Sequence, residues 1–245
     1  MKKITAIVLS LAMVFSFASC GEKKPEEPKY DPSQKAEGVM TYTQYAEAKK
    51  GDAVVVEAYV QAVQSWWDNK LSVYAQDPDG GYFIYNMTCS EEDSKNLVPG
   101  TKIKVEGVKD EWQGEVRIGA GATFSIGEGS WFAVPEDVTS LLGTDELIKH
   151  QNKLAAFKGL TVESTARYKY DGSGMRGDDL YFTASVNGKS FTFMVESYLC
   201  SKKTEVYKAV EALKTGDNIN MEGFLYWYEE CNPNITKLER IEVTR

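Results

Sequence analysis

A short strand-like stretch occurs twice in this 245-residue chain, and this repetition restricts the fold more than any other feature. The first copy is Pro99–Trp112, with the sequence PGTKIKVEGVKDEW, and the second is Thr215–Trp227, with the sequence TGDNINMEGFLYW. Each copy has a Gly at a turn, alternating apolar and polar residues, a Glu-Gly pair and an aromatic tip. Such self-similarity indicates a repeated supersecondary unit. We therefore expect two copies of one small β-rich module.

The residues around the two stretches match as well, in the order helix, three strands, helix, two strands. In the first copy we expect helices at 41–50 and 90–96, and strands at 53–64, 70–76, 82–87, 101–109 and 115–118, the last extended through 123–126 past a kink at 119–121. In the second copy we expect helices at 136–151, with a break at Gly143, and at 204–214, and strands at 153–164, 180–186, 190–196, 218–227 and 235–243. Cys89 and Cys200 follow the third strand in each copy, and Gly107 and Gly223 match in the fourth. Asn187-Gly188 is a strong signal for a tight hairpin.

This order of elements resembles the OB fold, a five-stranded Greek-key barrel that binds oligonucleotides and oligosaccharides. The resemblance implies a mainly β protein with two tandem barrels, each carrying a helix between its third and fourth strands. The expected domains are residues 40–128 and 136–245.

The first twenty residues resemble a bacterial lipoprotein signal. Lys2 and Lys3 precede an apolar run over 4–17, and Ala18-Ser19-Cys20 follows it. The run is short for a transmembrane helix. The resemblance implies lipidation of Cys20 and anchoring to a bacterial membrane, facing outside the cytoplasm. Phe17 departs from the usual Leu, and an ordinary secretory signal is the alternative.

Residues 21–39 have the composition of a disordered tether. They contain three prolines and mixed charge, with little apolar surface to bury. After a lipidated Cys20, such a segment would hold the folded part away from the membrane.

The net charge of the chain is −8, and loss of Lys2 and Lys3 with a leader would lower it to −10. Binding to nucleic acid or to an anionic membrane surface needs clusters of Lys and Arg. An acidic chain therefore favours other partners, although a local basic groove is compatible with this total.

No catalytic constellation is visible in the sequence. His150 is the only His, so neither a zinc cluster nor a Ser/His or Cys/His pair is available. We expect no metal, no cofactor and no enzymatic activity, with carboxylate-only catalysis as the open exception. Asp77-Pro-Asp-Gly-Gly81 has the residues of a tight turn, with a calcium site as the alternative.

Besides Cys20 the chain has three cysteines, and export would permit disulfides. A bridge between Cys200 and Cys231 would tie the tip beyond the fourth strand to the end of the third. The matching places of Cys89 and Cys200 favour small buried positions instead, and both interpretations stay open.

Aromatic residues at the expected loop tips are the clearest functional signal. In OB folds the loops after strands one and four flank the binding face, where flat rings stack on ligands. The candidate ligand-binding residues are Trp66, Trp67, Trp112, Tyr168, Tyr170, Tyr226, Trp227 and Tyr228. The structural alternative is that these rings cap open barrel ends.

Two functions are consistent with these aromatic tips. One is a non-catalytic binding module for an oligosaccharide or another extended polymer, with nucleic acid ranked lower because of the charge. The other is a structural lipoprotein that docks a protein of a cell-envelope complex through the same tips.

Overall fold

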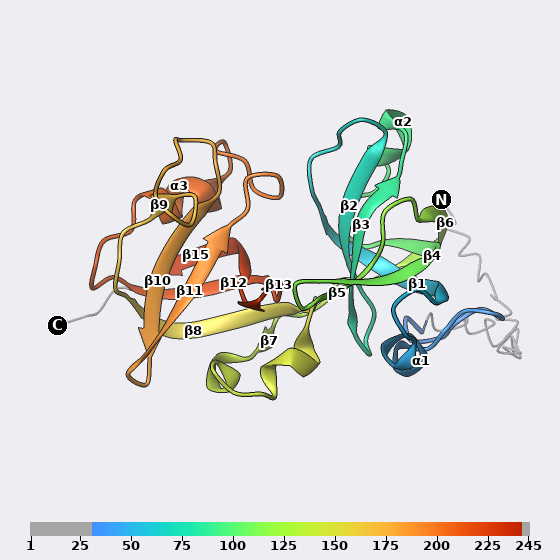
Figure 1. Ribbon diagram of the computed structural model, residues 1–245, viewed down its shortest axis with the longest axis horizontal. Helices are drawn as coiled ribbons and strands as arrows, with labels where there is room; N and C mark the ends of the chain where they lie inside the picture. Colours follow the sequence, from blue (N-terminus) through green and yellow to red (C-terminus); the bar gives the residue numbers. More distant parts are fainter. Residues whose placement is uncertain (1–30, 242–245) are drawn as a thin grey trace, which may run out of the picture. The chain divides into compact units, whose positions relative to one another are not determined.

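The computed structural model describes residues 31–241, which build two closed five-stranded barrels (Figure 1). The proposed signal, Cys20 and most of the proposed tether lie outside the described residues. The first barrel contains α1 (Tyr42–Glu47), β1 (Ala53–Val63), β2 (Lys70–Gln76), β3 (Gly81–Thr88), α2 (Glu91–Ser94), β4 (Thr101–Trp112), β5 (Glu115–Ile118) and β6 (Thr123–Ser130). The connecting segment contains β7 (Glu136–Asp137) and the 3-10 turns η1 (Thr139–Leu141) and η2 (Leu147–His150). The second barrel contains β8 (Leu154–Val162), β9 (Arg167–Tyr168), β10 (Leu180–Val186), β11 (Lys189–Val195), α3 (Glu205–Glu211), β12 (Asn218–Phe224), β13 (Trp227–Tyr228), β14 (Glu230–Cys231) and β15 (Asn234–Arg240).

The two barrels have the same strand order. In the first, β1, β2, β3, β5 and β4 are neighbours in that order, and β1 pairs with β4 to close the barrel. In the second, β8, β10, β11, β15 and β12 follow the same order, and β8 pairs with both β10 and β12. The third and fifth strands are parallel in each barrel. This is the expected OB-like Greek-key topology, and the mainly β fold class is confirmed.

The bend at Gly119–Gly121 divides one long strand into β5 and β6. β4 pairs with β5 from Lys109↔Ile118 onward and with β6 from Glu106↔Thr123 back to its start. Gly121 has a φ of 86°, which favours glycine. The predicted extension of the fifth strand past a kink is therefore confirmed.

The matched glycines of the fourth strands have a shared structural reason. A Cβ on Gly107 would lie 2.6 Å from Ile118 Cγ2, and one on Gly223 would collide with the backbone of Asn234. Both glycines let the fifth strand cross close to the fourth, where a side chain would not fit. The repeat in the sequence therefore marks the same crossing in both barrels.

The three short α-helices within residues 31–241 begin at side-chain caps. The Oγ atoms of Thr41, Ser90 and Thr204 accept hydrogen bonds from backbone N–H groups in the first turns of α1, α2 and α3. α3 buries Val206, Tyr207 and Val210 in the core of the second barrel, whereas α2 buries no residue.

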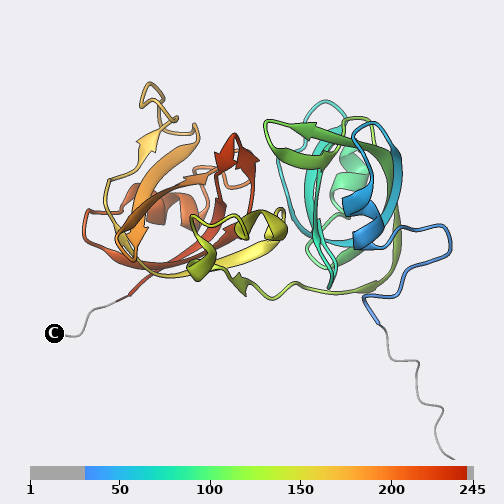
Figure 2. The same cartoon turned by 60° about the horizontal axis from the view of Figure 1, so that its bottom comes forward.

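The predicted helix over 136–151 is wrong. The segment instead forms a short strand and two 3-10 turns, and it runs from β6 to β8 (Figure 2). Gly143, with a φ of 75°, separates the turns, and Val138, Leu142 and Leu147 are buried in the core of the second barrel. These apolar residues do not share one face of an α-helix, and their burial against the barrel wall decides the conformation instead.

The hairpin between β10 and β11 turns at Asn187 and Gly188, whose φ values are 54° and 74°. Two positive φ values in a two-residue loop define the tight turn that Asn-Gly predicts. This turn fixes the register between β10 and β11, and it therefore determines which of their side chains share a face.

Residues of the two barrels contact one another within one compact unit. The rings of Tyr74 and Phe224 stack with centroids 4.4 Å apart, and Asn234 Nδ2 donates to the Tyr74 hydroxyl over 2.8 Å. Beside them the backbone N–H of Trp227 donates to Glu115 Oε2, also over 2.8 Å. The barrels are thus joined by a buried, hydrogen-bonded contact.

Candidate functional site: a groove lined by aromatic side chains

Two hollows of about 710 Å³ and 690 Å³ meet on the described surface. The first is lined from the first barrel by the loop after β1 and by outward residues of β2, β3 and β4. The second is lined mainly by the equivalent elements of the second barrel. Trp112, Glu196 and Tyr226 line both hollows, so they form one continuous surface, which we call the aromatic groove. Its Tyr and Trp side chains are Trp67, Tyr85, Trp112, Tyr170, Tyr181, Tyr198, Tyr226 and Tyr228.

Strand alternation explains why aromatic residues face both the core and the groove. On β3, Tyr82 and Ile84 belong to the core of the first barrel, whereas Phe83 and Tyr85 lie on the opposite face. Successive side chains of a strand point to opposite faces, so a run of apolar residues lines both. The second barrel repeats this with Tyr181, which lines the groove between core residues Leu180 and Phe182.

Several of these rings are exposed and packed against one another at their edges. Trp67, Trp112 and Tyr170 are 72%, 45% and 59% exposed, respectively. Trp112 and Tyr228 have ring centroids 5.1 Å apart, and Tyr170 meets Tyr181 edge to face at 5.6 Å. Rings held in this way offer flat faces at small cost in side-chain entropy.

Among residues 31–241, Arg117 is the one basic residue that lines the aromatic groove. Its guanidinium lies 4.3 Å from the ring centroid of Tyr85 and 5.6 Å from that of Trp112, and Nε donates to Asp110 over 2.8 Å. This pairing lowers the pKa of Asp110. Arg117 therefore packs against the rings of Tyr85 and Trp112, and Asp110 balances its charge.

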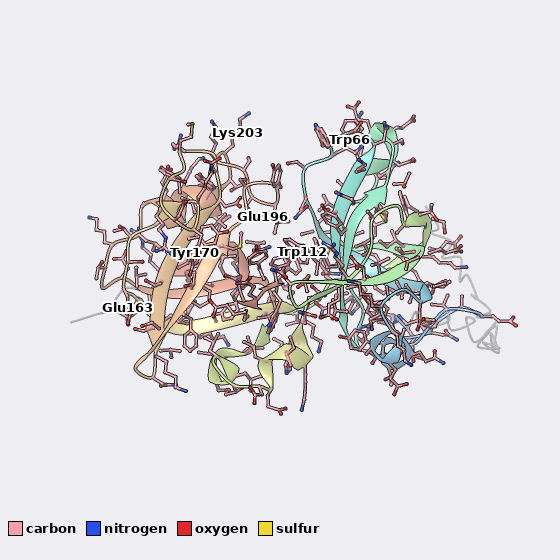
Figure 3. The ribbon with its side chains drawn as sticks, in the orientation of Figure 1. Trp66, Trp112, Glu163, Tyr170, Glu196 and Lys203 are labelled. Atoms are coloured by element: carbon pink, nitrogen blue, oxygen red, sulfur yellow. The ribbon has the colours of Figure 1, made fainter. Side chains whose placement is uncertain are left out.

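Glu196, directly after β11, places a carboxyl group where the two hollows meet. In the view of Figure 3 it lies between Trp112 and Tyr170, which line the second hollow with it. Gln64 Nε2 lies 2.8 and 2.7 Å from its two carboxyl oxygens. Burial, with a further contribution from the nearby charge of Asp179, raises the pKa of Glu196 to about 7 although the Gln64 hydrogen bond lowers it.

Charge in the aromatic groove is predominantly negative. Asp179, Glu196, Glu229 and Glu230 line it, against Arg117 alone. Neutral hydrogen-bonding groups are also present, including the side chains of Gln64, Ser72, Asn86 and Asn232. The groove therefore offers stacking faces and hydrogen bonds, but little to neutralise a polyanion.

The structure brings five of the eight predicted aromatic residues into the groove: Trp67, Trp112, Tyr170, Tyr226 and Tyr228. The other three have other contacts. Trp66 packs against the core of the first barrel, and its Nε1 donates to the Cys89 carbonyl over 2.9 Å. Tyr168 donates its hydroxyl to Glu211 over 2.6 Å and packs against the core of the second barrel.

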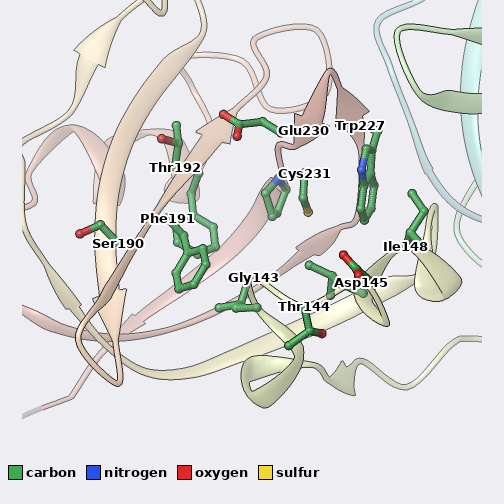
Figure 4. Close-up of a pocket in the computed structure, with 14 residues that line it drawn as sticks. Gly143, Thr144, Asp145, Ile148, Ser190, Phe191, Thr192, Trp227, Glu230 and Cys231 are labelled. Carbon is green, nitrogen blue, oxygen red and sulfur yellow. The ribbon is translucent and has the colours of Figure 1, made fainter.

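The third of these residues, Trp227, lines a separate pocket of about 530 Å³ (Figure 4), which has Glu230 in common with the aromatic groove. This pocket lies between the turns of the connecting segment, β11 and the β13–β14 hairpin. Phe191, Ile148 and Cys231 also line it, and Asp145 and Glu230 are its charged residues. The neighbouring residues Trp227 and Tyr228 thus line different cavities: Trp227 lines this pocket and Tyr228 lines the aromatic groove.

Sequence inspection missed Glu196, Tyr85, Tyr181, Tyr198 and Arg117. Period-two alternation within β3 and β10 could have identified Tyr85 and Tyr181 as outward-facing. Glu196 follows a strand without any local signal, because its place in the groove depends on contacts with the other barrel.

The remaining sequence candidates have structural roles. The Asp77 carboxylate accepts hydrogen bonds from Lys35 Nζ, the Tyr82 hydroxyl and the backbone N–H groups of Asp79 and Gly80, as a turn requires. His150 Nδ1 lies 3.1 Å from Glu136 Oε2. Over residues 31–241, no group of three His, Cys, Asp or Glu side chains is placed to hold a metal ion.

Cys89, Cys200 and Cys231 are free thiols. The structure therefore does not contain the suggested Cys200–Cys231 disulfide. Cys89 and Cys200 are both buried, as their matching places favoured. Among the described helices, none has the length and apolar character to cross a membrane.

Comparison with known proteins identified neither a matching family model nor a matching curated protein. Solved structures of low similarity were found. The chain is similar to an Ifi202 HINa domain in complex with 20-bp double-stranded DNA, at 11% identity and a TM-score of 0.35 over 78% of this chain and all of that one. It is also similar to a murine DNA-binding protein bound to double-stranded DNA, at 8% identity and a TM-score of 0.36 over 78% and 97%. A mutant single-stranded DNA-binding protein from Thermus aquaticus matches at 15% identity and a TM-score of 0.28 over 80% and 97%. Values this low leave the OB-like assignment resting on the strand order of the two barrels.

Proposed function

We propose that this protein is an exported, membrane-anchored binding module that holds an extended oligosaccharide in the aromatic groove. The observation that carries the proposal is the shared groove: the same face of both barrels contributes exposed rings to one surface. In OB folds, strands two and three and the loops after strands one and four form the binding face.

An oligosaccharide matches the chemistry of this surface. Sugar rings have apolar C–H faces that stack on flat aromatic rings, and hydroxyl groups that both donate and accept hydrogen bonds. Exposed Trp67, Trp112 and Tyr170 supply the first kind of contact. Gln64, Asn86 and Asn232 supply the second. A few oriented polar groups among aromatic walls are typical of ligand sites.

DNA is the competing ligand, because the solved structures named above include DNA-binding proteins. Phosphate backbones are held chiefly by Lys and Arg. Arg117, the basic residue of the groove lining, is paired with Asp110, and four carboxyl groups surround the ligand path. We therefore rank DNA below a glycan, as the sequence also suggested.

The binding test uses the protein from Gly21 onward, titrated with neutral oligosaccharides of increasing length and with single-stranded DNA at moderate salt. We expect a long neutral oligosaccharide to quench Trp fluorescence. Trp67→Ala and Trp112→Ala should each weaken binding about ten-fold, since one stacked ring contributes ~1–3 kcal/mol. Trp227→Phe, which alters the separate pocket, is the matched control and should bind normally.

Two other outcomes would replace this proposal. Binding of single-stranded DNA in place of glycans would assign the groove to nucleic acid. If neither ligand binds, and crosslinking in membranes recovers a specific partner through Trp67 or Trp112, the groove is a docking surface of an envelope complex.

The membrane anchor is tested at Cys20. Wild-type protein should partition with membranes and incorporate labelled palmitate, and Cys20→Ala should lose both properties. Equal labelling of the two proteins would contradict lipidation at this residue.

A further inference from the structure

We infer that Glu196 determines the specificity of the aromatic groove, selecting uncharged oligosaccharides and excluding acidic ones. This inference rests on the proposed function and extends it to the class of glycan. It starts from position: Glu196 lines both hollows, together with Trp112 and Tyr226. A polymer that spans the groove must therefore pass this carboxyl group.

The side chain of Glu196 is held in place. Gln64 Nε2 lies within 2.8 Å of both carboxyl oxygens, and Asn234 Nδ2 lies 3.5 Å from one of them. A carboxylate has about four lone-pair positions. Positions not used by Gln64 can accept hydrogen bonds from sugar hydroxyls, and the fixed geometry prevents the group from swinging away from an acidic ligand.

The surroundings of Glu196 do not neutralise its charge. Asp179 carries a like charge near it. Burial and neighbouring carboxylates raise the pKa values of four nearby groups: Tyr74, Tyr181, Tyr226 and Cys200. The raised pKa is about 12 for Tyr181 and about 11 for Cys200. Those four groups are neutral near pH 7. Arg117 lines the first hollow, but it is committed to Asp110.

Burial and the charge of Asp179 raise the pKa of Glu196 to about 7, and this makes the selection pH-dependent. Above pH 7 the group is a carboxylate and repels a bound uronic acid. Below pH 7 it is protonated, the repulsion is lost, and the proton can donate to the ligand. A neutral sugar experiences hydrogen bonding in both states and should respond much less.

The experiment compares a neutral oligosaccharide with a uronic-acid oligosaccharide of the same length and linkage, by calorimetry at pH 6 and pH 8. We expect the wild type to bind the neutral ligand equally within about three-fold at the two pH values. The uronic-acid ligand should bind at least about ten-fold more weakly at pH 8, a difference of ~1.4 kcal/mol. Glu196→Gln, which keeps hydrogen bonding but cannot ionise, should abolish this difference.

Two further variants separate a direct effect from general charge. Glu163→Gln removes one negative charge from the same barrel outside the groove lining, and it should keep the wild-type pH dependence. Asp179→Asn removes the like charge beside Glu196 while keeping an oxygen acceptor for Ser197. It should move the midpoint of the uronic-acid affinity profile to lower pH.

The possible failures are distinguishable. If the neutral ligand does not bind the wild type at either pH, the proposed function is overturned, and this inference with it. If the neutral ligand binds but the uronic-acid ligand shows no pH dependence, or Glu163→Gln removes it as well, only the role of Glu196 is overturned. The wild-type profiles and Asp179→Asn decide the matter even if Glu196→Gln does not fold.

Discussion

The two barrels have one topology but contribute different chemistry to the groove. The first supplies Trp67, Tyr85 and Trp112, braced by Arg117. The second supplies tyrosines together with all four carboxyl groups of the groove lining. Its longer α3, its glycine-rich loop after β8 and its extra β13–β14 hairpin have no counterpart of equal length in the first barrel.

The features that the barrels share lie where strands pack, and the groove chemistry lies elsewhere. Strand order and the fourth-strand Gly are shared, and a Cβ at either glycine would meet the crossing fifth strand. Loops and outward strand positions differ: they are mainly aromatic in the first barrel, and aromatic and acidic in the second.

The two barrels share a buried contact, and the largest expected change in stability tests whether each barrel needs it to stay folded. Phe224→Ala removes the ring that stacks on buried Tyr74. It should lower the free energy of unfolding by about 3–5 kcal/mol, the usual cost of removing a buried aromatic side chain. Urea denaturation followed by fluorescence and circular dichroism measures this.

Tyr74→Phe is the milder companion variant, since it removes only the hydroxyl that accepts from Asn234. It should cost about 1–3 kcal/mol, because the buried Asn234 amide loses the shorter of its two hydrogen bonds. If Phe224→Ala changes stability by less than ~0.5 kcal/mol, the contact between barrels does not stabilise the fold and the two units are separable.

The matched glycines provide a sharper comparison of the two barrels. In Gly223→Ala the new Cβ meets the backbone of Asn234, whereas in Gly107→Ala it meets the side chains of Ile118 and Ala122. Side chains can shift more easily than a paired strand. We expect a cost of about 3 kcal/mol for Gly223→Ala and about 1–2 kcal/mol for Gly107→Ala. Equal denaturation midpoints for the two variants would contradict this ranking.

Glu115 makes the contact between the barrels sensitive to pH. Burial raises its pKa to about 8, although hydrogen bonds from Trp227 and Asn152 and the charge of Arg117 lower it. The folded protein therefore holds a proton that the unfolded chain releases near pH 4.5. Stability should fall as the pH rises from about 4.5 to about 8, and this proton should cause no further loss above that.

The test compares urea denaturation of the wild type and Glu115→Gln at pH 5 and pH 8. Relative to the wild type, the variant should gain about 3 kcal/mol between these values, because it has no proton to lose. A smaller slope should remain from Glu196, whose pKa is raised to about 7. Parallel pH profiles of the two proteins would exclude Glu115 as the titrating group.

The smallest expected difference concerns the caps of the equivalent helices. Thr204→Ala should cost about 1 kcal/mol, because α3 is packed into the core and must stay folded. Ser90→Ala should change global stability by only a few tenths of that amount, since α2 buries no residue and can fray locally. Hydrogen exchange should show faster exchange confined to α2 in the second variant. Equal losses would mean that α2 supports its barrel as α3 does.

Repetition made most of the fold predictable from sequence, because each strand could be checked against its copy. The segment over 136–151 is the exception. Its counterpart in the first copy does form a helix, α1, but here packing of Val138, Leu142 and Leu147 against the second barrel decides the conformation. Five of the eight Tyr and Trp residues of the groove were predictable for the same reason: tip aromatics such as Trp67 and Tyr170 occupy matching loops. The position of Glu196 in the groove depends on contacts between segments that are distant in sequence. The same is true of the positions of Trp66 and Trp227 outside the groove, and local sequence patterns do not encode such contacts.

The three cysteine thiols of residues 31–241 lie in surroundings that suppress their ionisation. Burial, together with nearby carboxylates, raises the pKa of Cys89 and Cys200 to about 11 and that of Cys231 to about 12. Only about one in ten thousand or fewer of these groups is a thiolate at pH 7, and thiolates are the species that attack disulfides and peroxides. These three thiols should therefore react slowly with disulfides and peroxides, because their surroundings keep them protonated.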